Sequence, residues 1–127
     1  MLYFIDIRFW EKIREFAPRV PKGRFIKLDE DSKINRVCLS DSIEGCLTGV
    51  SWGGYNLVKD PPFTTSDLIA IARVYEFNRD DISSGNLLTP KEVSKHVPDA
   101  EVGNEYWVVN QSIYPEKSYI IILRDYY

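Results

Sequence analysis

The acidic residue best placed to do chemistry is Glu105, which interrupts the otherwise apolar segment NEYWVV. Burying an unpaired carboxylate costs free energy, so Glu105 must face solvent, pair with a cation or line a cleft. In a strand, alternation puts Glu105, Trp107 and Val109 on one face and Tyr106 and Val108 on the other. An acid beside a tryptophan fits a cleft wall where the ring stacks on a flat ligand. It fits equally well a charge on an exposed edge strand.

Other polar residues offer weaker chemical signals. Ser40 and Ser42 lie between a predicted strand and a predicted helix, where a hydroxyl either caps the helix or belongs to a site. Arg19, held between two prolines in APRVP, could present a guanidinium to a phosphate or carboxylate, or simply be exposed. His96 is the only histidine and is predicted at a helix end, so neither a metal site nor a serine triad is expected.

The elements that would position these residues follow from the hydrophobic pattern. Strands are predicted over residues 2–9, 36–39, 67–77, 105–110 and 118–124. Helices are predicted over residues 10–16, where a continued strand is the alternative, over 43–50 and over 89–97. The helix at 43–50 is expected to open with a capping box of Asp41 and Glu44, and the helix at 89–97 with Thr89, Pro90 and Glu92. This order predicts one mostly antiparallel α+β domain over residues 1–127.

The composition restricts the partners of the protein. The 127 residues carry a net charge of -3 and 28% charged residues, which disfavours nucleic acid as a partner. No apolar stretch is long enough to span a membrane, and Asp6 and Arg8 interrupt any leader at the start, so a cytoplasmic protein is expected. Without a secretory leader, Cys38 and Cys46 are expected to be reduced and small hydrophobes rather than a disulfide.

A family resemblance comes from two segments, NEYWVVNQSIYPEKSYIIIL and RVCLSDSIEGCL. The first resembles the strand that carries the catalytic glutamate in the ADP-ribosyltransferase superfamily, particularly its poly(ADP-ribose) polymerase branch, with Glu105 as the matching residue. The second, which lies upstream, resembles the superfamily's second element, a strand that ends in small polar residues and is followed by a helix. Ser40, Asp41 and Ser42 occupy the place of the Ser-Thr-Ser that this element has in the arginine-serine-glutamate branch. The chain has no His-Gly element at its start, so the first residue of the triad must be an arginine, with Arg19 preferred over Arg8. Gly103 stands where the toxin-like branch has a second Glu or Gln.

The resemblance implies a compact ADP-ribosyltransferase-like fold with two small sheets and short helices. It implies NAD as substrate, with Glu105, Arg19 and Ser40 as catalytic residues. The nucleotide would be bound by residues with aromatic, hydroxyl or guanidinium side chains: Ser42, Tyr75, Tyr106, Trp107 and Arg8. A carboxylate beside the ribose would stabilise the oxocarbenium-like state in which the nicotinamide bond breaks.

Three functional hypotheses follow. The first is an enzyme that transfers ADP-ribose to a macromolecule or cleaves NAD. The second is a module on the same scaffold that captures NAD, ADP-ribose or a related nucleotide without turnover. The third is a protein-binding inhibitor of the kind encoded by phages and mobile elements, with a protein target as its partner.

Overall fold

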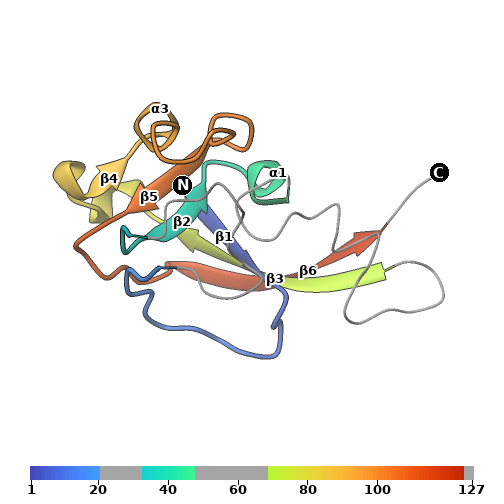
Figure 1. Cartoon of the computed structure of the whole chain (residues 1–127). Helices are drawn as coiled ribbons and strands as arrows, with labels where there is room; N and C mark the ends of the chain where they lie inside the picture. The colour runs from blue at the N-terminus through green and yellow to red at the C-terminus, as the bar shows by residue number, and fades with distance from the viewer. Residues whose placement is uncertain (21–32, 48–68, 125–127) are drawn as a thin grey trace.

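The computed structural model describes residues 1–20, 33–47 and 69–124, and these residues form an α+β fold around one six-stranded antiparallel sheet (Figure 1). The strands are β1 (Leu2–Asp6), β2 (Val37–Ser40), β3 (Ile69–Phe77), β4 (Leu87–Leu88), β5 (Glu105–Val108) and β6 (Lys117–Arg124), in the spatial order β4-β5-β2-β1-β3-β6. The helices are α1 (Ile43–Gly45), the 3-10 turns η3 (Arg79–Asp81) and η4 (Ser84–Asn86), and α3 (Pro90–Val93). The described residues thus contain one sheet where two small sheets were expected.

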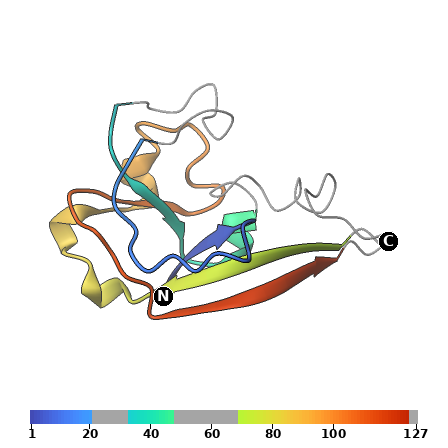
Figure 2. The same cartoon turned by 90° about the horizontal axis from the view of Figure 1, so that it is seen from below.

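The sheet is covered on both faces. On one face α1 packs beside β1, and α3 packs beside β5 and β4 (Figure 1). On the other face, loop segments rather than an α-helix cover the core, which is built around Phe16, Tyr75, Phe77, Tyr106 and Ile113. β3 and β6 extend beyond the shorter strands as a two-stranded ribbon (Figure 2). We call the face with α1 and α3 the helix-covered face and the opposite face the loop-covered face.

Most predicted strands are confirmed within a few residues. Those at 36–39, 67–77, 105–110 and 118–124 correspond to β2, β3, β5 and β6. The prediction of one buried face for residues 2–9 is wrong in two ways. Leu2 and Ile5 are both buried although they point to opposite faces, and the strand ends at Asp6. A local contact ends the strand, because the Asp6 carboxylate accepts a hydrogen bond from the backbone N–H of Arg8 at 2.9 Å.

The helix predicted over residues 10–16 is absent. This segment lies on the loop-covered face without regular secondary structure, and Phe16 pairs with Ile113 through two backbone hydrogen bonds of 2.8 and 3.0 Å. The Tyr75 hydroxyl accepts from the N–H of Ile13 and donates to the carbonyl of Glu11, at 2.9 and 3.2 Å. Partners distant in sequence therefore satisfy backbone groups that a helix would have paired locally.

The two helix starts differ in how well the sequence predicted them. Thr89, Pro90 and Glu92 form the expected capping box at α3. At α1 the cap is Ser42, whose hydroxyl accepts from the N–H of Gly45 at 2.9 Å, so the predicted box of Asp41 and Glu44 is wrong. The apolar stripe of that helix is confirmed as far as Leu47, and Val50 lies outside the described residues.

Within residues 1–20, 33–47 and 69–124, no helix is long and apolar enough to cross a membrane.

Candidate functional site

Ser40 and Glu105 lie directly opposite each other on β2 and β5. Tyr3 on β1 is the next partner of Ser40, so Glu105, Ser40 and Tyr3 form a row across three strands. Directly opposed residues of antiparallel strands point to the same face, which here is the helix-covered one. The structure thus brings together two of the three predicted catalytic residues from segments far apart in the chain.

The Glu105 carboxylate is buried, with 3% of the residue exposed, and its Oε2 accepts a hydrogen bond from the indole Nε1 of Trp107 at 2.6 Å. The two residues share a face of β5, as the alternation predicted. A hydrogen bond of this length offsets part of the cost of taking the carboxyl group out of water.

The Trp107 ring is fully buried and contacts the side chains of Arg36 and His96. The Arg36 guanidinium lies over the ring at 4.2 Å from its centroid, and the imidazole of His96 stacks on it at 5.5 Å with an interplanar angle of 28°. Trp107 is therefore packed within the protein and fixes the position of Glu105, where the sequence suggested a platform for a flat ligand.

Ser40 is held by a tight contact between three segments. It is fully buried and its hydroxyl donates to the carbonyl of Gly103 at 2.6 Å. Gly45 of α1 lies so close that a Cβ there would overlap both groups. Next to it, burial raises the pKa of the Cys46 thiol to about 12, and the thiol donates to the carbonyl of Tyr3 at 3.2 Å. The serine thus joins the end of β2, the start of β5 and α1.

Arg19, the preferred third member of the triad, is elsewhere. Its backbone pairs with that of Arg36 just before β2, at 3.0 Å in both directions, and its side chain is exposed. Arg36 precedes Ser40 by four residues, which in a strand is about 13 Å. The arginine that the structure buries against Trp107 is Arg36.

The other arginine considered, Arg8, is already paired. Its Nε and Nη2 donate to the two carboxylate oxygens of Asp6 at 3.2 and 3.0 Å. This hydrogen bonding to Asp6 raises the pKa of Arg8. The fork fixes the turn after β1, which gives Arg8 a structural role in this conformation.

The predicted nucleotide-binding residues are dispersed. Tyr75 and Tyr106 lie in the core of the loop-covered face, on the other side of the sheet from Glu105. The Tyr75 ring contacts Phe16 edge to face at 5.0 Å, and the Arg79 guanidinium lies 4.7 Å from the centroid of the Tyr106 ring. Ser42 is used as the cap of α1. The structure does not bring Tyr75 and Tyr106 together with Glu105.

The sequence did not lead us to place Arg36 or His96 in the site. The signal for Arg36 was present, because residues 36, 38 and 40 share a face of one strand and Ser40 was already a candidate. His96 had no such signal, since its contact with Trp107 depends on how the turn after α3 folds back over β5.

Two shallow hollows in the described part of the chain are lined by residues other than Ser40 and Glu105. One lies between η3 and residues 111–114, and the other is lined by Pro18, Asn35 and residues 110–112. Among the described residues there is no group of histidine, cysteine and carboxylate side chains that could hold a metal ion.

No family model, curated protein or solved structure matches this chain.

Proposed function

We propose that this chain is an ADP-ribosyltransferase-like protein that uses NAD, transferring ADP-ribose to a macromolecule or cleaving NAD. The observation that supports the proposal is the direct pairing of Ser40 with Glu105. The resemblance involves these two residues through separate segments and requires them in one site, and no local pattern would have forced them to meet.

In the proposed reaction, the bond between the ribose C1′ and the nicotinamide nitrogen breaks, and the electron pair leaves with nicotinamide. The positive charge that develops on the ribose is stabilised by the Glu105 carboxylate. That carboxylate is held away from water, where electrostatic stabilisation is stronger. Water or an acceptor group then bonds to C1′ and releases a proton. The guanidinium of Arg36 takes the place of Arg19 as the cation of the site.

A second candidate is a module that binds NAD, ADP-ribose or a related nucleotide without turnover. The observation in its favour is the burial of Glu105 at 3% exposure, with Oε2 bonded to Trp107. A carboxylate held in this way is better placed to order the site than to approach a ribose.

One pair of measurements separates the two candidates. For an enzyme, the purified chain releases nicotinamide from NAD, and Glu105→Gln lowers the rate at least about a hundredfold while melting like the wild type. Glu101→Gln is the matched control, because it removes an exposed carboxylate four residues away. For a binding module, NAD or ADP-ribose raises the melting temperature without nicotinamide release. If these nucleotides neither react nor shift the melt, both candidates are refuted for them.

A further inference from the structure

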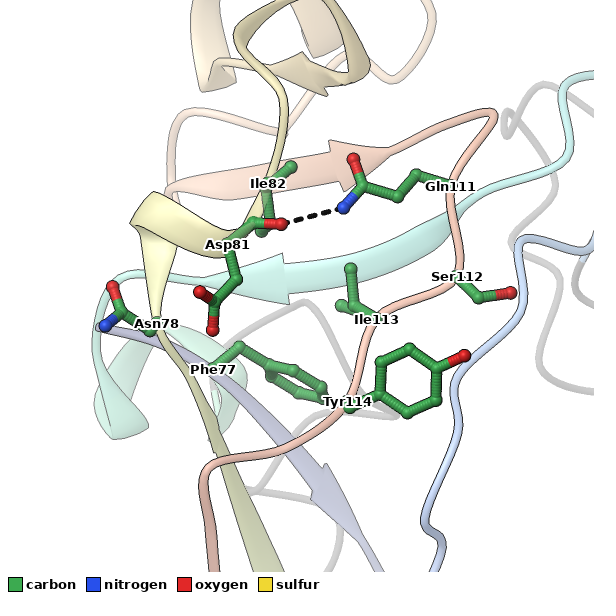
Figure 3. A pocket seen from close by; sticks show the side chains of 8 residues that line it. All are labelled: Phe77, Asn78, Asp81, Ile82, Gln111, Ser112, Ile113 and Tyr114. Carbon is green, nitrogen blue, oxygen red and sulfur yellow. Dashed lines mark hydrogen bonds between the residues drawn. The ribbon is translucent and has the colours of Figure 1, made fainter.

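Figure 3 shows the hollow between η3 and residues 111–114. It lies on the loop-covered face, on the other side of the sheet from Glu105. Its floor is made by three buried apolar side chains, Phe77, Ile82 and Ile113. Its rim is made by five side chains with polar groups: Asn78, Asp81, Gln111, Ser112 and Tyr114. An apolar floor with a few convergent polar groups is the usual form of a binding site.

The size and charge of the hollow restrict the kind of ligand that it can bind. Its volume is about 210 Å³, below the roughly 300–1,000 Å³ of sites for drug-sized molecules, so it suits one side chain. The lining includes the carboxylate of Asp81 and no basic residue. Glu15 adds a second carboxylate behind Tyr114, whose hydroxyl donates to it at 2.8 Å and whose pKa is raised by that bond. The hollow is therefore complementary to a cation.

The rim is held in place before any ligand binds. Gln111 donates from Nε2 to the carbonyl of Asp81 at 2.8 Å, the bond drawn in Figure 3. Its Oε1 accepts from the N–H of Ser83 and from the amide of Asn86 at 3.1 and 3.2 Å. These three bonds use the amide of Gln111 to fix η3 and its following turn against residues 111–114. Because these residues are already ordered, binding a ligand costs less free energy for ordering them.

The Asp81 carboxylate itself is exposed and has no hydrogen-bond or ion-pair partner among the described residues. In Figure 3 it points to the side of the hollow on which the rings of Phe77 and Tyr114 lie. The nearest basic residue in sequence, Arg79, has its guanidinium over the Tyr106 ring instead.

We propose that this hollow receives an arginine side chain of a protein partner. A guanidinium is planar, stacks on aromatic rings and bonds a carboxylate through two parallel N–H groups, so the exposed ring of Tyr114 and the carboxylate of Asp81 together fit it better than they fit an ammonium. Tyr114 is 61% exposed, and exposed tyrosines are frequent anchors of protein interfaces. This proposal does not depend on NAD, because none of the lining residues belongs to the Glu105 site.

The test is an NMR titration of the ¹⁵N-labelled full chain with three blocked tripeptides, acetyl-Gly-X-Gly-amide, where X is arginine, lysine or the neutral analogue citrulline. The arginine peptide should shift the amide signals of Asp81 and residues 111–114 in a saturable way, with weaker shifts from lysine and none from citrulline. Asp81→Asn should weaken arginine binding by about two- to fivefold, the loss expected for one exposed charge pair. Tyr114→Leu, which removes the exposed ring, should weaken it as well.

Asp80→Asn is the matched control, since it removes a neighbouring exposed carboxylate of η3 that does not line the hollow. It should bind the arginine peptide as the wild type does. Equal shifts from citrulline, or unchanged affinity in Asp81→Asn, would overturn the proposal. Equal affinity for lysine would overturn the assignment to arginine.

Discussion

At the residue scale, the hydrogen bond to Trp107 sets the position of the Glu105 side chain. A carboxylate at 3% exposure is stable only if the protein replaces the water it has lost, and the indole N–H does part of this at 2.6 Å. Arg36 and His96 both lie against the ring and restrict how Trp107 can turn. Contacts among Trp107, Arg36 and His96, which come from three segments of the chain, thus set the orientation of the carboxylate.

This arrangement predicts energetic coupling between the two residues. Trp107→Phe removes the N–H donor and should destabilise the wild type more than it destabilises Glu105→Met, in which no carboxylate is left without its bond. A double-mutant cycle by urea unfolding should give a coupling free energy of about 1–3 kcal/mol. The same cycle with the exposed Glu101→Met should be additive within about 0.5 kcal/mol. Equal coupling in both cycles would refute the role of the hydrogen bond.

At the element scale, α1 is fixed to the sheet by close approach more than by its length. It is a single turn, and Ser42 caps its start. Gly45 allows its backbone to lie against the Ser40 hydroxyl and the Gly103 carbonyl. This contact joins α1 to the end of β2 and to the start of β5, so any side chain at position 45 should disturb both strands beside Glu105.

The matching prediction compares two glycines. Gly45→Ala should lower the free energy of unfolding by about 1–3 kcal/mol, because its Cβ must displace a buried hydroxyl or a backbone carbonyl. Gly85→Ala in η4 places its Cβ in open space and should change stability by no more than about 0.5 kcal/mol. Urea unfolding of the two variants measures both values. Similar losses would show that the close approach at Gly45 is not limiting.

At the scale of the whole molecule, two groups on the helix-covered face have raised pKa values. Burial raises the pKa of Cys46 from its ordinary 9.0 to about 12. Burial and then a hydrogen bond to Glu76 raise the pKa of Tyr119 from 10.0 to about 12. In both, the folded state keeps a proton that the unfolded state loses first. Their contribution to stability is therefore complete below the unfolded pKa and is lost as pH rises toward 12.

This predicts how two variants respond to alkali. Cys46→Ala should be less stable than the wild type at pH 7, and the difference should shrink from about pH 9 upward, by at most about 1.4 kcal/mol per pH unit. For Tyr119→Phe the difference should begin to shrink only above about pH 10. Urea unfolding at a series of pH values measures both windows. A difference that stays constant from pH 7 to 12 would contradict the raised pKa values.

The sequence by itself determined what depends on local pattern. The apolar run at 67–77 and the alternation of NEYWVV predicted β3 and β5, and Thr89, Pro90 and Glu92 predicted the start of α3. In each case the decisive groups lie within a few residues of each other, so local chemistry is sufficient. The prediction that Glu105 and Trp107 share a face was correct for the same reason.

Only the tertiary structure decided which residues meet. The spacing of residues 10–16 suits a helix, but Tyr75 and Ile113 form hydrogen bonds with backbone groups that the helix would have paired internally. The arginine beside Trp107 is Arg36 and not Arg19, because the register of β2 on β5 selects it. The hollow lined by Asp81 and Tyr114 arises where two distant segments pack together. Such contacts depend on strand order and register, which a local hydrophobic pattern does not specify.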